Sequence, residues 1–390
     1  MPAHCSPKPV RSHHLIAFVL FVLFFAQCAS FIASVPFTQL EADQIARGVG
    51  LLRRIAPASE PASSPLVPLL SVAGIVFHLP QSPVLLDQFW LDQHRWFIRM
   101  PFLAAGIFLA HSLWYVARRL YGNAAGNVAL ALYAFSPGMI ARSSLAGPHI
   151  FAAWGAFGLI FTAIATAHTL YAPREVILWN WKRITLLGIS IAFAVGTQWP
   201  LAWLLIPAAA FMLWAVPHRR GAALLILLAA VAVSLVVFYF CYFANFGALA
   251  HGLAHAVWLG WVPQSVAPGL FARILGQFFF DSVPAALLAF PCAFVTWCAW
   301  PRTRFFGNTA PLIVLVLLLG MGMVLPQNGG GVILFAALPF VLLFIAGVFA
   351  DLLESKLQAR ALAFIFAVIA AQATYSVSSL ARMSSRVPGL

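Results

Sequence analysis

The segment Leu15–Val35 reads LIAFVLFVLFFAQCASFIASV and carries no charged residue. At about 1.5 Å per residue, a helix of about 21 residues spans the hydrocarbon core of a bilayer. The chain then enters Pro36–Met100, the one long interruption before a succession of further apolar runs. Of the 390 residues, 63% are hydrophobic and 8% are charged, whereas roughly 25% of the residues of a soluble domain are charged. This composition predicts an all-α polytopic membrane protein.

Apolar runs of about 20 residues predict eleven transmembrane helices within a single domain over residues 1–390. They lie near Leu15–Val35, Phe97–Val116, Ala124–Ile140, His149–Leu170, Ile184–Thr197, Leu201–Val216, Ala222–Phe246, Val283–Trp300, Ala310–Leu325, Val332–Ala350 and Ala361–Val377. Several of these runs are short for a span. The first run also resembles a signal peptide, with a basic flank and small residues beside Cys28, but its length favours a retained helix.

Basic residues predict the orientation of these helices, because positively charged connections remain on the cytoplasmic side. With the N-terminus inside, every predicted inner connection carries basic residues: Lys8 and Arg11; Arg118 and Arg119; Arg174, Lys182 and Arg183; Arg219 and Arg220; Arg302 and Arg304; Lys356 and Arg360. The formal net charge of +13 is distributed in these singles and pairs. That pattern indicates a role in topology and argues against nucleic-acid binding.

Charged residues concentrate in the first outer loop, 36–100, which holds five of the nine acidic residues. Charge is scarce in this chain, so a charged loop marks where recognition or chemistry could occur. Glu41 and Asp43 follow the outer end of the first helix. Either carboxylate could act as a general base or hold a divalent cation, or both could simply favour the start of a helix. Glu41–Arg54 predicts a short helix, and Pro65–Leu79 is an apolar segment too short to span, expected on the outer surface.

Two arginines, Arg95 and Arg99, lie at the outer mouth of the second predicted helix, on the side that the charge rule does not favour. Their guanidinium groups could bind a phosphate in a bidentate manner, or could extend into lipid headgroups. His149 opens the fourth predicted helix, where it could donate to a substrate or serve as a cap. The cysteines form no CxxC pair, and the residues alone predict no metal site.

Four segments resemble the second-to-fourth-helix region of C-type membrane glycosyltransferases. They are RMPFL at Arg99–Leu103, VARRLYG at Val116–Gly122, ALALYAFSP at Ala129–Pro137 and IARSS at Ile140–Ser144. The similarity is greatest to family 39, the protein mannosyltransferase-like enzymes and the bacterial aminoarabinose transferases. LEADQIARG at Leu40–Gly48 is similar to the acidic motif in the first outer loop of these enzymes, and Ser64-Pro65-Leu66 falls where they often have a Pro-Pro-Leu run.

The resemblance implies an enzyme of the bacterial inner membrane that transfers a sugar from a polyprenyl-phosphate donor to a lipid, glycan or protein acceptor. Its partners would be that donor and membrane lipids, with or without a divalent cation, and no C-terminal soluble domain is expected. The implied catalytic residue is Glu41, with Asp43 in reserve. The implied substrate-binding residues are Arg95, Arg99, His149 and Gln198.

The sequence also departs from the family pattern. The acidic motif usually reads Asp-Glu with the Asp as catalytic base, and that first position is Leu40 here. A second acidic position corresponds to His149, and a basic position corresponds to Gln198. A non-catalytic lipid-binding or assembly subunit on the same scaffold is therefore the alternative hypothesis. A transporter is a third, although the sequence shows neither inverted repeats nor paired broken helices.

The predicted topology is tested with reporter fusions. Fusions after Arg119, Arg220 and Arg304 should report the cytoplasm, because these basic pairs are retained inside, and fusions within Ser59–Ser64 should report the outer side. The reverse pattern at two of these sites would overturn the predicted orientation.

Overall fold

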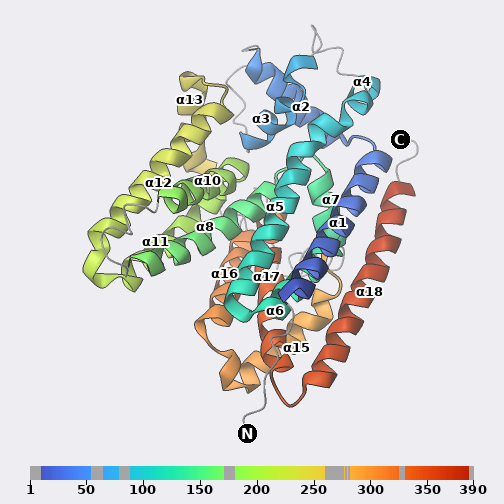
Figure 1. The fold of residues 1–390 in the computed structure, drawn as a ribbon. Helices are drawn as coiled ribbons and strands as arrows, with labels where there is room; N and C mark the ends of the chain where they lie inside the picture. The colour runs from blue at the N-terminus through green and yellow to red at the C-terminus, as the bar shows by residue number, and fades with distance from the viewer. Residues whose placement is uncertain are drawn as a thin grey trace.

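The computed structural model describes residues 10–53, 65–78, 88–170, 181–259, 276, 279, 282–324 and 330–385. Over these residues the chain is an all-α bundle without strands (Figure 1). The α-helices and short 3₁₀ helices (η) are α1 (Val10–Ser34), α2 (Gln39–Leu52), α3 (Leu66–Ala73), η1 (Val76–His78), α4 (Gln88–Gln93), α5 (Arg95–Tyr121), α6 (Asn123–Ala134), α7 (Pro137–Ser144), α8 (His149–Thr169), α10 (Trp181–Thr197), η3 (Trp199–Leu204), α11 (Leu205–Ala215), η4 (Pro217–Arg219), α12 (Arg220–Cys241), α13 (Phe246–Leu259), α15 (Ala286–Ala299), η5 (Pro301–Thr303), α16 (Phe306–Val324), α17 (Gly330–Leu353) and α18 (Gln358–Ser385).

The fold class predicted from composition is confirmed, but the number of spans is not. Within the described residues, 7 helices are long and apolar enough to cross a membrane, or up to 8 if the bent pair α6–α7 counts as one span. The eleven predicted runs include shorter pieces. The run predicted at Leu201–Val216 divides into η3 and α11, and the run predicted at Val283–Trp300 contains α15, which has 14 residues.

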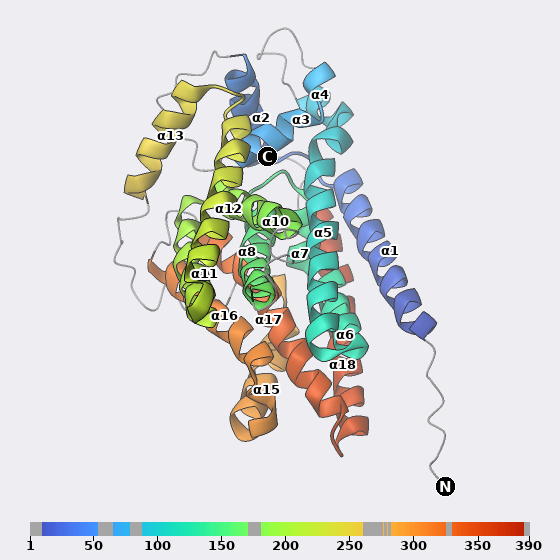
Figure 2. The same cartoon turned by 60° about the vertical axis from the view of Figure 1, so that its left-hand side comes forward.

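Helix α17 is the centre of the bundle. Its sequence from Val332 to Ala350 contains no polar side chain, and its membrane-length window is wholly buried. A helix that is apolar all round must be covered on every side. It packs against α5, α6, α8, α15, α16 and α18, and Figure 2 shows it passing between α16 and α6.

Helices α8 and α10 form an antiparallel pair held close by glycines. A Cβ on Gly155 would collide with the backbone of Ala194, and one on Gly158 would collide with the side chain of Ser190. Because contacts move back along α10 as they move forward along α8, the start of α8 lies at the same end as the end of α10. His149 and Gln198 are thereby brought to one end of the bundle.

The predicted helix Ala124–Ile140 is broken, as α6 and α7 meet at a bend of 65°. Proline at the first position of α7 cannot continue the hydrogen-bond ladder of α6, so carbonyl groups at the end of α6 lose their partners. Two glutamines from flanking helices supply donors: Nε2 of Gln372 donates to the carbonyl of Leu132 at 2.6 Å, and Nε2 of Gln27 donates to that of Ala134 at 3.1 Å. The break is therefore stabilised by α1 and α18, as a membrane interior requires.

Short helices cover the upper end of the bundle in Figure 1, where α2, α3 and α4 lie over the spans. The helix predicted at Glu41–Arg54 is present as α2. The segment predicted at Pro65–Leu79 begins with α3, whose 8 residues are far too few to cross a bilayer. Helix α3 packs on α2 at Gly48, where a Cβ would collide with the carbonyl oxygen of Pro68.

Connections that carry basic residues gather at the other end of the bundle. The end of α5, which holds Arg118 and Arg119, and the turn between α17 and α18 both lie at the end where α1 begins (Figures 1 and 2). Basic residues and the start of the chain thus share one end, as the orientation prediction requires. Which end faces the cytoplasm stays a prediction.

Replacement of Gln372 tests the stabilisation of the broken helix. Gln372→Leu leaves the buried carbonyl of Leu132 without a donor, so the free energy of unfolding should fall by about 1–3 kcal/mol. The matched control is Gln358→Leu on the same helix, where the side chain is exposed and the change should be small. Thermal unfolding in one detergent compares the two, and equal stability of both variants would contradict the assignment.

Candidate functional site

Helix α2 begins with a capping box. Oγ1 of Thr38 accepts a hydrogen bond from the backbone N–H of Glu41 at 3.3 Å, and Oε2 of Glu41 accepts from the backbone N–H of Thr38 at 3.0 Å. The sequence Thr-x-x-Glu is the usual signature of this motif, because each side chain satisfies a backbone donor that the helix leaves unpaired. The cap places the Glu41 carboxylate at the base of α2, turned toward the bundle.

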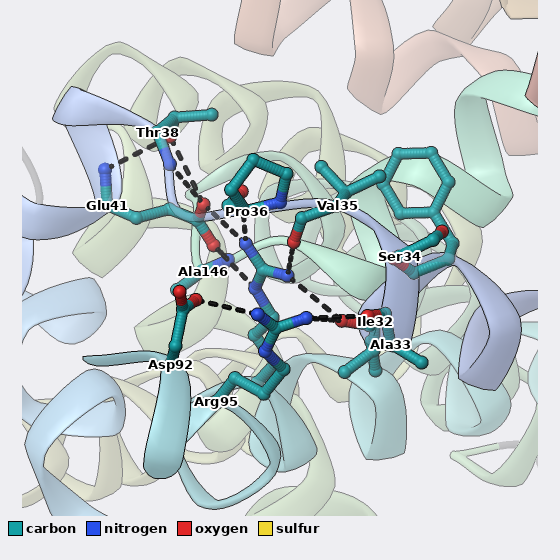
Figure 3. A network of polar contacts seen from close by, with 12 residues as sticks. Ile32, Ala33, Ser34, Val35, Pro36, Thr38, Glu41, Asp92, Arg95 and Ala146 are labelled. Carbon is teal, nitrogen blue, oxygen red and sulfur yellow. Dashed lines mark hydrogen bonds and ion pairs between the residues drawn. The ribbon is translucent and has the colours of Figure 1, made fainter. Parts of the chain in front are cut away.

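A buried ion pair joins this carboxylate to α5 (Figure 3). Arg99 donates from Nε to Oε1 of Glu41 at 3.0 Å and from Nη2 to Oε2 at 2.9 Å, a bidentate arrangement. The side chain of Arg99 is 0% exposed and that of Glu41 is 3% exposed. The remaining donors of Arg99 reach the carbonyls at the end of α1, with Nη1 2.7 Å from Val35 O and Nη2 3.0 Å from Pro36 O.

The same carboxylate also holds the connection between α7 and α8. The backbone N–H of Ala146 donates to Oε1 of Glu41 at 2.8 Å. Both oxygens of Glu41 therefore accept hydrogen bonds from the protein, and the residue links α2, α5, the end of α1 and the segment that precedes His149. The Glu41 carboxylate therefore holds these segments together, and neither of its oxygens is free to act as a base.

Arg95 is engaged in a similar way at the start of α5 (Figure 3). Its Nη2 lies 2.7 Å from Oδ1 of Asp92, and its Nη1 donates to the carbonyl of Ala33 at 2.6 Å. The two arginines predicted to bind a phosphate thus both donate to protein carboxylates and to the end of α1. Their geometry fastens α5 to α1.

Asp43 lies on the opposite, exposed face of α2 from Glu41, since two residues along a helix correspond to a turn of about 200°. Its Oδ1 accepts a hydrogen bond from Nε2 of Gln39 at 3.1 Å. Leu40, at the position where the resemblance expects an aspartate, is 76% exposed. The other acidic residues of the first loop, Glu60 and Asp87, lie outside the described residues.

His149 follows this network in the chain, three residues after Ala146, as the first residue of α8. Its ring contacts Phe335 of α17 edge-on at 5.6 Å, and its Nδ1 is buried with no hydrogen-bond partner among the described residues. Arg142 lies in the last turn of α7, seven residues before His149. The Arg142 side chain is exposed and forms no ion pair or hydrogen bond with the described part of the chain.

Sequence reasoning did not select Arg142, although the residue stands inside the IARSS segment that carried the resemblance. Its charge did not distinguish it from the other arginines as a candidate phosphate ligand, because the sequence does not reveal which arginines are paired. The structure supplies that distinction. Among Arg95, Arg99 and Arg142, only Arg142 has a guanidinium without a protein acceptor in the described ranges.

Gln198 is buried at the end of α10, at the same end of the bundle as His149. The next residue, Trp199, lines an apolar cavity of about 280 Å³ between α10, η3, α12 and α13. Val195, Ser234 and Phe238 are among its other walls, and one of the helices that line it, α12, is a candidate membrane span. The polar end of the site therefore adjoins an apolar groove.

No group of three or more His, Cys, Asp or Glu side chains within the described ranges could hold a metal ion. The divalent cation considered from the sequence would need ligands from the substrate or from the remaining residues. A cation site stays a prediction.

Comparisons with known proteins identify the fold. No family model matches the chain, and no curated protein matches it in sequence. The structure is similar to the oligosaccharyltransferase AglB from Archaeoglobus fulgidus in complex with an inhibitory peptide and a dolichol-phosphate. The TM-score is 0.59 at 13% identity, covering 95% of this chain and 56% of AglB. An Archaeoglobus fulgidus oligosaccharyltransferase in the apo form gives a TM-score of 0.62 at 13% identity, over 96% of this chain and 56% of that one.

A structure of ArnT from Cupriavidus metallidurans in the apo state is also similar, with a TM-score of 0.41 at 10% identity over 86% of this chain and 76% of ArnT. This chain spans little more than half the length of the oligosaccharyltransferases. At these identities the likeness concerns the fold.

Neutralising the buried carboxylate tests its structural role. Glu41→Gln leaves the Arg99 guanidinium buried without a counter-charge, so the free energy of unfolding should fall by about 3–5 kcal/mol. Asp43→Asn, the control on the exposed face of α2, should change it by less than about 0.5 kcal/mol. The readout is thermal unfolding of the purified variants, and a Glu41→Gln protein as stable as the Asp43→Asn protein would contradict this assignment.

Proposed function

The chain has the fold of a C-type membrane glycosyltransferase, and we propose that it transfers a sugar from a polyprenyl-phosphate donor at the outer face of a bacterial inner membrane. Two observations carry the proposal: within the described residues the guanidinium of Arg142, in the last turn of α7, has no acceptor, and the buried Nδ1 of His149, at the start of α8, has no hydrogen-bond partner. Cationic and neutral donors of this kind suit a phosphate linked to a sugar. The acceptor would be a lipid, glycan or protein hydroxyl.

The donor phosphate is assigned to Arg142 in place of Arg95 and Arg99. Binding a phosphate at either of those residues would require breaking an ion pair, and for Arg99 it would leave the Glu41 charge buried and alone. Arg142 requires no such exchange, because its guanidinium has no acceptor among the described residues. The nearby His149 ring would donate to a phosphate or sugar oxygen.

The isoprenoid tail of the donor is assigned to the apolar cavity that begins at Trp199. Its lining by Val195 and Phe238 matches a hydrocarbon chain, and its wall includes Trp199, the residue that follows Gln198. Gln198 would then contact the sugar or the phosphate. AglB was captured with dolichol-phosphate, a lipid of the same chemical class as the donor proposed here.

Transfer needs a base that takes the proton of the acceptor hydroxyl as its oxygen attacks the anomeric carbon. The bond from that carbon to the phosphate oxygen breaks, and polyprenyl phosphate leaves with its charge beside Arg142. Both oxygens of Glu41 are occupied by protein donors, whereas Asp43 is exposed on the outer face of α2. Of the two predicted carboxylates only Asp43 is exposed, and it points away from His149, so we propose it as the base for an acceptor that approaches over the exposed face of α2.

A non-catalytic subunit that binds the donor lipid is the second candidate function. Two observations favour it: the exposed Leu40 at the position where the resemblance expects the catalytic aspartate, and the occupied carboxylate of Glu41. This alternative shares the phosphate site at Arg142 but performs no transfer. Binding and transfer must therefore be measured separately.

Two variants distinguish these functions in membranes supplied with a radiolabelled polyprenyl-phosphate sugar. Asp43→Asn should lower transfer by about 10²–10⁴-fold, because a positioned base is lost, and should leave donor binding intact. Arg142→Gln should weaken donor binding by about 10–100-fold, because a charge-assisted hydrogen bond is worth about 1.5–3 kcal/mol. The control is Arg47→Gln, which removes an exposed arginine that lies on α2 instead of α7.

Unchanged transfer in Asp43→Asn would exclude this residue as the base. If the wild-type protein shows no transfer, and its donor binding is weakened by Arg142→Gln, the non-catalytic function is established. If Arg142→Gln binds the donor as strongly as Arg47→Gln does, the phosphate site at Arg142 is contradicted for both candidate functions.

A further inference from the structure

Three basic side chains surround the indole of Trp114 at the end of the bundle where α1 begins, far from the site described above. The ring of His14 lies 5.8 Å from that of Trp114, and the ring of His111 lies 5.7 Å from it. The guanidinium carbon of Arg118 lies 5.1 Å above the indole. His111, Trp114 and Arg118 recur at intervals of three and four residues, so they share one face of α5.

The cluster is held in place by α6. Trp114 is 9% exposed, and its Nε1 donates to Oδ1 of Asn127 at 3.3 Å. At Gly126 a Cβ would come within 2.9 Å of the Arg118 Cβ and 3.3 Å of Cδ1 of Trp114. The glycine thus allows α6 to press against both residues, which fixes the stem of Arg118 and directs its guanidinium across the indole.

The positive charge of this cluster is not compensated within the described residues. The side chain of Arg118 forms no ion pair or hydrogen bond there, and neither His14 nor His111 contacts a carboxylate in the described residues. Arg99 and Arg302, by contrast, each pair with a glutamate. A fixed cation at the edge of a membrane span attracts an anion, and basic pockets between transmembrane helices characteristically receive anionic lipid headgroups.

The surroundings of the cluster favour a lipid over a free ion. Leu15 and Phe18 of α1 and Tyr115 of α5 are large, apolar and exposed, and all three belong to candidate membrane spans. Acyl chains would cover these side chains, whereas a soluble phosphate would leave them bare. His111 lies seven residues before Arg118, about 10 Å deeper along α5, at a depth where a lipid carries its ester oxygens.

We propose that His14, Trp114 and Arg118 bind the phosphate of an anionic phospholipid, with His111 donating to an ester oxygen of the same molecule. The indole holds the guanidinium, the phosphate bridges Arg118 and His14, and the acyl chains lie along the exposed faces of α1 and α5. This lipid site is independent of the donor site. It fastens the first helix, which contacts the rest of the bundle over a small part of its surface, to α5.

The test measures lipid binding by the full-length protein in detergent. Phosphatidylglycerol, phosphatidylcholine with the same acyl chains, or inorganic phosphate is added, and the midpoint of thermal unfolding and the lipids retained in native mass spectrometry are recorded. Phosphatidylglycerol should raise the midpoint of the wild type and one molecule should be retained. Phosphatidylcholine and inorganic phosphate should do neither.

Arg118→Gln should weaken phosphatidylglycerol binding by about five- to tenfold, as expected for one basic residue near a charged lipid. Arg119→Gln is the matched control, because it removes the neighbouring charge, which is exposed and does not contact Trp114. It should bind like the wild type. If Arg118→Gln does not fold, His14→Gln on the exposed face of α1 takes its place, with a reduced affinity expected.

Three results would overturn the proposal. Equal affinity of Arg118→Gln, or of His14→Gln in its place, and Arg119→Gln would show that the charge acts only in bulk. An equal shift of the unfolding midpoint with phosphatidylcholine would show that the site does not recognise the charge of the headgroup. An equal shift with inorganic phosphate would show an ion site without lipid.

Discussion

The end of the bundle that α2 covers depends on one buried ion pair, between Glu41 and Arg99. Burying two charges is costly, and the cost is offset only where geometry is good and the remaining polar atoms are bonded. Here the guanidinium also donates to the carbonyls of Val35 and Pro36, and the carboxylate also accepts from Ala146. The pair therefore fixes the end of α1, helix α2 and the segment before α8 relative to one another.

The membrane-spanning part obeys the same rule with neutral groups. Where α6 ends inside the bundle, Gln27 and Gln372 donate to carbonyls that would otherwise face hydrocarbon. The part of α17 from Val332 to Ala350 passes through the centre because it has no polar side chain that would need a partner there. A broken helix and a continuous one thus coexist in one bundle because each satisfies its polar atoms differently.

The arginines of this chain fall into two groups: those that bond to protein acceptors and stabilise the fold, and those without such acceptors among the described residues, which we propose bind ligands. Arg95 and Arg99 have carboxylate and carbonyl partners, and their role is to hold α5 against α1. The side chains of Arg142 and Arg118 have neither within the described residues; Arg142 is in the last turn of α7, and Arg118 lies over the indole of Trp114 near the end of α5. An anion can reach either of the second pair without breaking an existing contact, which is why the two proposed phosphate sites are centred on them.

The sequence by itself determined the fold class, most helix positions, the short helix at Glu41 and the resemblance that the structural comparisons support, because composition, apolar length and a capping box act over short distances. Only the tertiary structure decided that Glu41 and Arg99 face each other across 58 residues, that the helix before Pro137 is broken, and that Arg142 has no side-chain partner in the described part of the chain. Pairing depends on which helices become neighbours. Local sequence patterns do not determine which helices become neighbours. The sequence therefore identified the charged residues but could not distinguish those that stabilise the fold from those that are available to bind a ligand.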